Sequence, residues 1–335
     1  MRNRIYHQWS QQFLISNGDQ TYVRTTSSGD ETTVLSEAQS YGMLLTVYAA
    51  QKGQANQENF DSLYRYYKNH RLEGTQLMSW KQVIKNGQET VEKHNATDGD
   101  LYIAYSLIEA AKQWPDKAQE YEGQAKSILI DILRFNYNED TGVLKVGNWA
   151  KKNTDFYYLM RTSDTLPHYF QVFYNLSGDE QWLDIKDKML GQLEQISSQS
   201  ETGLLPDFIW VEKSGARVAD ANTIESQYDG AYSYNACRLP YHLAQSRDER
   251  SQKIVQKMMA FFMKEKRIYA GYDLQGHALN QYQAGSFLAP ITYAANTVEG
   301  NLKLLQQNKY IFTQDLPLDN YYDATMITMI ALELF

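Results

Sequence analysis

Two carboxylate-bearing segments of this sequence are suited to acid–base chemistry, and the first of them contains Glu37. It stands in VLSEAQSYGMLL, where Ser36 could cap a helix and Tyr41 follows about one turn later. Burial generally raises the pKa of a carboxyl group, which suits such a group to protonate a leaving group near neutral pH. The alternative is a first-turn glutamate that only stabilises the helix dipole. Glu37 is therefore a candidate general acid with a structural alternative.

The second acidic segment is HNATDGDLYIAYSLIEAAKQW, in which Asp98 and Asp100 flank Gly99 just before a strongly apolar run. The two aspartates could bind Ca²⁺, cap the following helix or reach into a cleft. The calcium interpretation is weak, because the spacing is not that of an EF-hand and the later bidentate glutamate is missing. Capping explains one aspartate but not both.

The segment QYDGAYSYNACRLPYH contains Cys237, the one cysteine of the chain. A cysteine nucleophile needs a histidine that a third polar group holds in place. His242 is five residues further on, on a different helical face. A lone cysteine on an apolar helix is typically a small buried hydrophobic residue, so we expect Cys237 to pack in the core.

Helices must position these groups, because apolar residues recur at helical spacing over most of the chain. Helices are expected within residues 38–51, 59–70, 100–114, 121–135, 163–177, 179–197, 232–245, 250–265, 287–297, 301–312 and 321–335. Strand-like alternation is sparse and confined to short pieces such as 21–26 and 142–147. About a dozen helices joined by polar loops, with no Pro/Ser-rich linker, predict a closed ring of helical hairpins in one domain, residues 1–335.

Composition excludes several classes of partner. Thirty-two basic and forty acidic residues give a net charge of −8, with the basic residues scattered singly, so a nucleic-acid partner is not expected. No run approaches the roughly 18–20 apolar residues of a membrane helix. The start, MRNRIYHQW, lacks the apolar core of a signal peptide, which predicts a cytoplasmic chain or a mature form. The 26 tyrosines, 12 phenylalanines and 6 tryptophans point to a ligand cleft, because aromatic faces pack well on sugar rings.

Several of these segments together resemble glycoside hydrolase family 8. ATDGDLYIAYSLIEAAKQW matches the family signature A-[ST]-D-[AG]-D-x-x-I-A and continues to match through Ala110 and Trp114. SEAQSYGM, LMSWKQ, RTSD, GLLPDFIW and GYDLQGHALNQYQAGSFLAPI also resemble the family, so the resemblance covers nearly the whole chain. It implies an all-α (α/α)6 barrel that hydrolyses β-1,4-linked polysaccharides with inversion and without a cofactor or a metal.

The resemblance also implies roles for the acidic residues. Glu37 would be the general acid, and Asp98 would be the aspartate that holds the distorted sugar at the cleavage point. Inversion requires two carboxyl groups about 6.5–9.5 Å apart, because a water molecule must fit between the base and the sugar.

The general base is harder to assign than the general acid. In cellulase-type members of the family the base is the aspartate of a Y-D-A-x-R segment, and that segment reads YNACR in this chain. Asn235 therefore occupies the usual base position, and an amide cannot accept the proton of the attacking water. A chitosanase-like subgroup carries asparagine there with a glutamate on the preceding segment, which IESQYDG resembles. Glu225 is accordingly the candidate base, with Asp229 and Asp220 as rivals. An engineered inactive variant and a natural loss of activity are the competing explanations of Asn235.

Further residues are candidates for binding the substrate. Sugar-stacking platforms would be Tyr41, Trp80, Tyr102 and Trp149, with Asp100, Arg161, Asp164, Asn235 and Arg238 as polar partners; each ring could equally be packing. The family commonly continues after YNACR with Pro-Trp-Arg, whereas this chain has Pro240, Tyr241 and His242, which leaves the polymer open.

These observations predict an inverting endo-β-glycanase acting on chitosan or a β-glucan. The alternatives are a hydrolase of a self-produced exopolysaccharide that trims or disperses a biofilm, and a noncatalytic carbohydrate-binding relative. The expected partner is the polysaccharide, with no nucleic acid and no membrane contact by this chain, and the protein is expected to be a monomer. An extracellular or cell-surface location is expected, with the targeting segment absent from this sequence.

Overall fold

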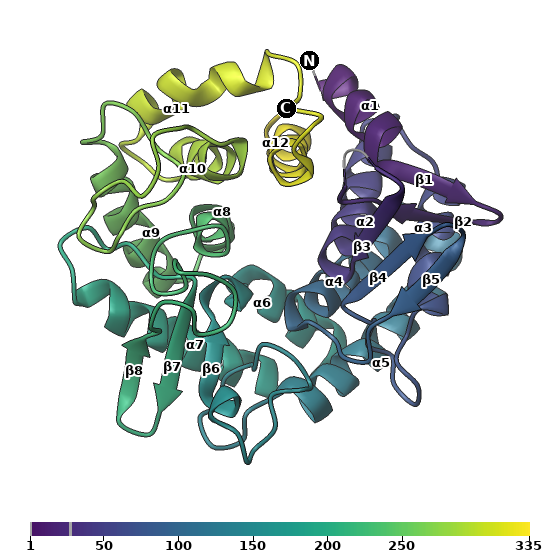
Figure 1. The fold of residues 1–335 in the computed structure, drawn as a ribbon, viewed down its shortest axis with the longest axis horizontal. Coiled ribbons are helices and arrows are strands. Elements are labelled where there is room, and N and C mark those ends of the chain that lie inside the picture. The colour runs from purple at the N-terminus through teal and green to yellow at the C-terminus, as the bar shows by residue number, and fades with distance from the viewer. Residues whose placement is uncertain (1, 27–28) are drawn as a thin grey trace. The chain divides into compact units, whose positions relative to one another are not determined.

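The computed structural model describes residues 2–26 and 29–335 (Figure 1). The chain divides into two compact units. The first unit comprises Met1–Asn136, Gly147–Trp149 and Asp315–Phe335, and the second comprises Tyr137–Val146 and Ala150–Gln314. The organisation as one domain, residues 1–335, stays a prediction. No helix among the described residues combines the length and the apolar character needed to cross a membrane.

Three helices of the first unit form its core. The helices of this unit are α1 (Arg2–Phe13), α2 (Ser36–Gln51), α3 (Gln57–Asn69), α4 (Thr97–Gln113), the short 3₁₀ helix η1 (Pro115–Lys117), α5 (Ala118–Asn136) and α12 (Tyr321–Leu334). α2, α4 and α12 are buried along most of their length, and α2 packs against both of the others. By contrast, α3 buries one face and exposes the other, as expected for an outer helix, and its buried residues are Phe60, Asp61, Leu63, Tyr64, Tyr66 and Tyr67.

Short antiparallel strands lead into these helices. β1 (Leu14–Asn17) pairs with β2 (Gln20–Val23), and β3 (Glu31–Leu35), β4 (Lys81–Lys85) and β5 (Gln88–Val91) form a three-stranded sheet in that order. β3 runs directly into α2, and its last residue, Leu35, pairs with Lys81 of β4. The sheet therefore fixes the start of α2.

The second unit has the same combination of buried and amphipathic helices with one small sheet. Its helices are η2 (Asp155–Tyr158), η3 (Thr162–Asp164), α6 (Pro167–Ser177), α7 (Gln181–Ser198), η4 (Ala236–Arg238), α8 (Leu239–Ala244), α9 (Glu249–Phe262), α10 (Gly285–Thr297), α11 (Leu302–Asn308) and η5 (Lys309–Phe312). Its strands β6 (Leu159–Arg161), β7 (Phe208–Glu212) and β8 (Gly215–Val218) form an antiparallel sheet in that order. Arg161 pairs with Phe208, so β6 and β7 bring two polar segments to one end of the sheet.

The expected helices are present, but several boundaries and most strands were predicted wrongly. The helix expected over 232–245 is only η4 followed by α8, and 301–312 divides into α11 and η5. The strand expected over 142–147 is reduced to an isolated bridge between Tyr137 and Leu144. β1 and the six strands from β3 to β8 were missed because each has only three to five residues, too few for alternation to be distinct.

Candidate active site

Glu37 lies half-buried in the first turn of α2, where β3 and a loop hold it. The backbone N–H of Ser36 donates to the carbonyl of Trp80 at 2.9 Å, which ties the start of α2 to the residue before β4. The expected cap by Ser36 is wrong, because Leu35 is the N-cap residue and Ser36 is already helical and buried. Glu37 is therefore placed by backbone contacts, without a side-chain cap.

The start of α4 lies directly against the start of α2. A Cβ atom at Gly99 would lie 2.7 Å from the Cβ of Ser36 and 2.9 Å from its carbonyl carbon. Real side chains do not approach so closely, so only glycine permits this packing. Glu37 and Asp98, the neighbours of Ser36 and Gly99 in the chain, are consequently carried by two helix starts in contact.

The charge of Glu37 affects the pKa of Tyr321, the first residue of α12. Burial is the main cause that raises the pKa of the Tyr321 hydroxyl well above its ordinary value, and the charge of Glu37 is the second. An electrostatic effect of this kind requires the two side chains to be close. Thus the beginnings of α2, α4 and α12 all contribute to the surroundings of Glu37.

Asp98 and Asp100 lie inside the first turn of α4, which begins at Thr97, before the start of the helix expected within residues 100–114. Ala96 is the N-cap residue of α4, without a side-chain cap bond. Asp98 is 5% exposed, and its Oδ1 accepts the N–H of Gly99 at 2.9 Å. A buried carboxylate is stabilised there by the positive end of the helix dipole.

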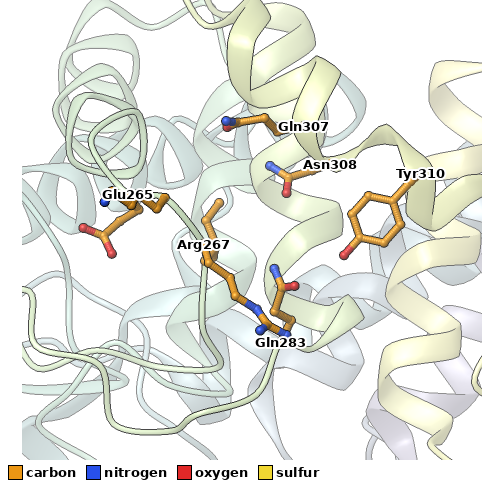
Figure 2. Close-up of a pocket in the computed structure, with 8 residues that line it drawn as sticks. Glu265, Arg267, Gln283, Gln307, Asn308 and Tyr310 are labelled. Carbon is orange, nitrogen blue, oxygen red and sulfur yellow. The ribbon is translucent and has the colours of Figure 1, made fainter.

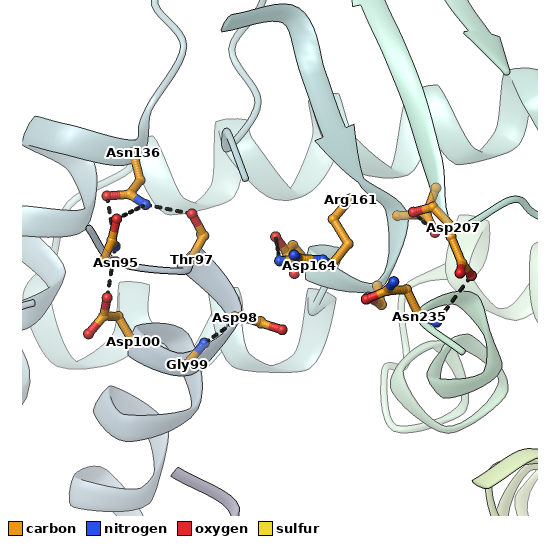
Figure 3. A network of polar contacts seen from close by, with 12 residues as sticks. Asn95, Thr97, Asp98, Gly99, Asp100, Asn136, Arg161, Asp164, Asp207 and Asn235 are labelled. Atoms are coloured by element: carbon orange, nitrogen blue, oxygen red, sulfur yellow. Dashed lines mark hydrogen bonds and ion pairs between the residues drawn. The ribbon is translucent and has the colours of Figure 1, made fainter. Parts of the chain in front are cut away.

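Asp100 is completely buried and belongs to an amide network (Figure 3). Its Oδ1 accepts the N–H of Met78 at 2.8 Å, and its Oδ2 accepts the side-chain amide of Asn95 at 2.8 Å. Burial raises the pKa of Asp100 to about 8, although both hydrogen bonds act in the opposite direction. These contacts support a positioning role for Asp100.

Asn95 links this aspartate to two other segments of the first unit. Its side-chain amide also donates to the Oδ1 of Asn136, the last residue of α5, at 3.2 Å. Its Oδ1 accepts the N–H of Asn148 at 2.7 Å, and its own N–H donates to the Oδ1 of Asn148 at 3.2 Å. Asn95 therefore couples the start of α4 to the residue that precedes Trp149.

The four predicted stacking rings fall into two groups. Tyr41 and Tyr102 are 0% and 1% exposed and meet edge to face at 4.8 Å between ring centroids, which favours the packing alternative for both. Trp80 is 37% exposed, with the ammonium group of Lys81 5.7 Å from its ring centroid. Trp149 is half-buried. The two tryptophans are therefore the rings of this set that a sugar could reach.

In the second unit, the predicted polar residues form a closed circuit of contacts. Glu225, whose side chain is 44% exposed, accepts a hydrogen bond from Arg161 (Nη2 to Oε1, 3.2 Å) and one from Asn235 (Nδ2 to Oε2, 2.8 Å). Arg238 donates through Nη2 to the Oδ1 of Asn235 at 2.9 Å and to the Oγ of Ser163 at 2.8 Å. Buried Asp164, the next residue after Ser163, pairs with Arg161 at 3.6 Å and completes the circuit.

Asp229, one of the two rival bases, fixes the backbone around Glu225. Its carboxylate is 1% exposed and accepts the N–H groups of Ile224, Glu225 and Ser226 at 2.7, 3.0 and 2.9 Å. The other rival, Asp220, has a side chain that is 90% exposed and lies 3.9 Å from Arg217. Of the three carboxylates, Glu225 alone is both accessible and oriented by side-chain donors.

Asp207 is a buried carboxylate that the sequence did not single out, although GLLPDFIW contains it. Its Oδ1 accepts three backbone N–H groups, from Ser233 at 3.1 Å, Asn235 at 3.1 Å and Ala236 at 2.6 Å. Figure 3 shows it joined to Asn235 beside Arg161 and Asp164. Asp207 therefore holds the segment that contains the predicted base position.

A separate hollow of about 270 Å³ lies between the end of α9 and the α11–η5 segment (Figure 2). Arg267, Gln283, Asn308 and Tyr310 are among its lining residues, and none of the predicted site residues lines it. Within the described residues, no group of three or more His, Cys, Asp or Glu side chains is arranged to hold a metal ion.

The sequence and the fold both match known enzymes. Residues 1–333 match the family described as Glycosyl hydrolases family 8. The chain belongs to glycoside hydrolase family 8. It is 33% identical to a beta-glucanase of Niallia circulans over 332 residues, 95% of this chain and 80% of that protein. It is 30% identical to endoglucanase A of Acetivibrio thermocellus over 309 residues, 87% of this chain but only 60% of that protein. A β-1,3-1,4-glucanase from Paenibacillus sp. X4 shares the fold with a TM-score of 0.88 and 29% identity, covering 99% of this chain and 89% of that one.

Membership of family 8 confirms two predictions made from the sequence. The fold class is the all-α (α/α)6 barrel of the family, in agreement with the predominantly helical chain and the solved relative. The enzyme class is that of a glycoside hydrolase of the inverting endo-β-glycanase type, in agreement with relatives named endoglucanase and beta-glucanase. The individual site residues stay predictions.

Cys237 is fully buried, as expected for a packing residue, and its Sγ contacts the carbonyl of Tyr234 at 3.2 Å. The residues of these networks that the sequence did not reveal are Asn95, Asn136 and Asp207, which bind backbone N–H groups or single side chains. Such contacts leave no spacing pattern in one sequence. Asn95 lies beside a segment that resembles the family and Asp207 lies inside one, whereas Asn136 carried no such signal.

Proposed function

We propose that this family 8 chain hydrolyses a β-1,4-linked glucan within the polymer, with Glu37 as general acid, Glu225 as general base and Asp98 binding the sugar at the cleavage point. The observation that carries the proposal is the position of Glu225, accessible to solvent and held by Arg161 and Asn235. The names of the relatives, beta-glucanase and β-1,3-1,4-glucanase, support a β-glucan as the substrate.

The hydrogen bonding of Glu225 suits a base that acts on water. A carboxylate offers about four lone-pair sites, and Arg161 and Asn235 occupy one on each oxygen. The remaining sites can accept a hydrogen bond from the attacking water. Two fixed donors also restrict the rotation of the carboxylate, which keeps its free lone pairs in one direction.

In the proposed reaction, the water oxygen attacks the anomeric carbon while Glu225 accepts one of its protons. The bond from that carbon to the glycosidic oxygen breaks, and Glu37 donates a proton to the departing oxygen. Attack from the side opposite the leaving group inverts the anomeric carbon. Asp98 would hold the sugar ring in its distorted form by accepting hydrogen bonds from hydroxyl groups, and the accessible faces of Trp80 and Trp149 would stack on sugars.

The test is the release of reducing sugar from lichenan, carboxymethylcellulose and chitosan by the wild type, Glu37→Gln and Glu225→Gln. We expect release from lichenan, a loss of about 10²–10⁴-fold in kcat for both variants, and initial products of inverted anomeric configuration by NMR. Asp220→Asn is the matched control for a loop carboxylate and should retain kcat. If Glu225→Gln kept the wild-type kcat, Glu225 could not be the base. If the wild type preferred chitosan to lichenan, the substrate would be chitosan and not a β-glucan.

The cellular setting follows from the same proposal. We infer an extracellular or cell-surface enzyme, because a long polysaccharide does not cross a membrane. We also propose that the enzyme acts as a monomer. A self-produced exopolysaccharide is a further substrate to be included in the panel as purified matrix polymer. Cell fractionation and light scattering of the purified protein test location and oligomeric state.

A further inference from the structure

Asp207 is fixed at a junction of three segments in the second unit. Its backbone carbonyl accepts the N–H of Thr162 in η3 at 3.0 Å, and its N–H donates to the carbonyl of Ala231 at 2.8 Å. The next residue, Phe208, donates its N–H to the carbonyl of Asp229 at 2.9 Å. Asp207 therefore contacts the segments of Arg161, Glu225 and Asn235 through neighbouring backbone groups.

The carboxylate of Asp207 adds side-chain control over one of these segments. All three N–H groups that it accepts, from Ser233, Asn235 and Ala236, converge on Oδ1. Asp207 is 4% exposed, so water competes little for these bonds. The Asn235 side chain, whose backbone is held in this way, in turn donates to Glu225 at 2.8 Å.

We propose that Asp207 is a positioning residue of this enzyme: it holds the Ser233–Ala236 backbone so that the Asn235 amide keeps Glu225 aligned with the attacking water. This inference rests on the proposed role of Glu225 as the base. Asp207 touches no reacting atom and acts through Asn235. The asparagine at position 235 then has a function of its own, because its side chain connects the fixed backbone to Glu225 and so orients the Glu225 carboxylate.

The pKa of Asp207 is raised to about 7, which lies in the neutral range. Burial is the main cause and the charge of Glu225 adds to it, while the three N–H donors act in the opposite direction. The segments around it also carry charged and titratable groups, namely Arg161, Asp164, Glu225, Asp229, Tyr232, Cys237 and Arg238. An ionised carboxylate accepts hydrogen bonds more strongly than a neutral one, so the segment is held more firmly as the pH rises through 7.

The test compares kcat and KM of the wild type and Asp207→Asn on lichenan from pH 5.5 to 8.5. The amide oxygen introduced by this substitution can accept the same three N–H groups but carries no charge. We expect kcat to fall about 10–100-fold at pH 8 with KM within about threefold, because small displacements of a catalytic group cost that much. The ratio of wild-type to variant kcat should rise between pH 6 and pH 8. Equal kcat values, or a ratio that is constant with pH, would overturn the proposal.

Two further variants keep the result decisive. Asn235→Ala leaves the backbone N–H in place but removes the side chain that contacts Glu225. The ratio of wild-type to Asn235→Ala kcat should therefore rise between pH 6 and pH 8, and this can be measured even if Asp207→Asn does not fold. A ratio that does not change with pH would contradict the proposal. Asp248→Asn is the matched control, since Asp248 accepts two backbone N–H groups at the start of α9 and should leave kcat unchanged. Glu225→Gln distinguishes failure of the proposed base from failure of the proposed positioning residue. If Glu225→Gln retains wild-type kcat, the assignment of Glu225 as the base fails. If Glu225→Gln is inactive while the Asp207 and Asn235 variants keep wild-type kcat, only the role of Asp207 fails.

Discussion

The side-chain amide of Asn235 donates a hydrogen bond to Glu225, with 2.8 Å between Nδ2 and Oε2. The resemblance of YNACR to the Y-D-A-x-R segment predicts that Asn235 stands where cellulase-type members of the family carry their base, and its amide cannot accept a proton. The contact instead makes it a donor to the neighbouring carboxylate. Arg238 holds the other end of the amide at 2.9 Å, so the orientation of the amide is determined on both sides.

Asn235→Asp tests this relationship directly. The substitution restores the residue of the usual base position but replaces a donor by a second carboxylate next to Glu225. Because like charges at hydrogen-bonding distance disfavour double ionisation, one of the two carboxyl groups would stay protonated to a higher pH. We expect kcat on lichenan to fall at least about tenfold, with a shifted pH profile. An increase in kcat would instead indicate that Asn235 has replaced a catalytic aspartate and that the activity of this chain was reduced by that change.

The helices of this protein were predictable because apolar stripes repeat over several turns, as in α3 and α9. The candidate base could be located only through the family resemblance of IESQYDG, since a lone glutamate in a loop has no distinctive spacing. Its contact with Asn235, ten residues later, was not predictable. That contact depends on a loop whose shape is set by Asp229 and by backbone bonds.

The buried carboxylates show why the remainder of the site was not readable. Asp100 stands in a conspicuous DGD motif, which predicts a substrate ligand, yet its oxygens accept hydrogen bonds from Met78 and Asn95. Asp207 stands in a largely apolar segment, which gives no sign of a site residue. In both residues the partners are backbone N–H groups or a single amide, which any sequence can supply.

Asp229→Asn should loosen the loop that carries Glu225. Asp229 accepts three backbone N–H groups, one on Oδ1 and two on Oδ2, so an amide nitrogen at either position leaves at least one donor without an acceptor. A buried unsatisfied donor costs about 1–3 kcal/mol. We expect that loss in the free energy of unfolding by urea denaturation, together with a lower kcat. Unchanged stability and kcat would show that the loop is held by other contacts.

Gly99→Ala should separate the starts of α2 and α4. The added Cβ would meet both the side chain and the carbonyl carbon of Ser36, and backbone cannot move aside cheaply. Overpacking of this kind costs about 1–3 kcal/mol, and we expect that decrease in the free energy of unfolding, together with a lower kcat through displacement of Glu37.

Gly123→Ala in α5 is the matched control, because nothing lies within 4 Å of an added Cβ there. It should stabilise the protein by about 0.5–1 kcal/mol through helix propensity. Ser36→Gly in the Gly99→Ala background removes the side-chain clash but not the carbonyl clash and should restore stability in part. Equal effects of the two alanine substitutions would contradict the close approach of α2 and α4.

The pH dependence of stability should reveal the burial of Asp100. Its pKa is raised to about 8 in the folded chain, whereas an unfolded chain has an aspartate pKa of about 3.9. Between these values the folded state binds more protons than the unfolded state, so its stability falls as the pH rises from about 4 to about 8. In Asp100→Asn this contribution is absent, and the amide faces the donor of Asn95, which costs about 1–3 kcal/mol. We therefore expect the wild type to be more stable than Asp100→Asn at pH 5, with the gap in urea-derived unfolding free energy narrowing toward pH 9. A gap that stays constant or widens over that range would show that Asp100 is ionised throughout.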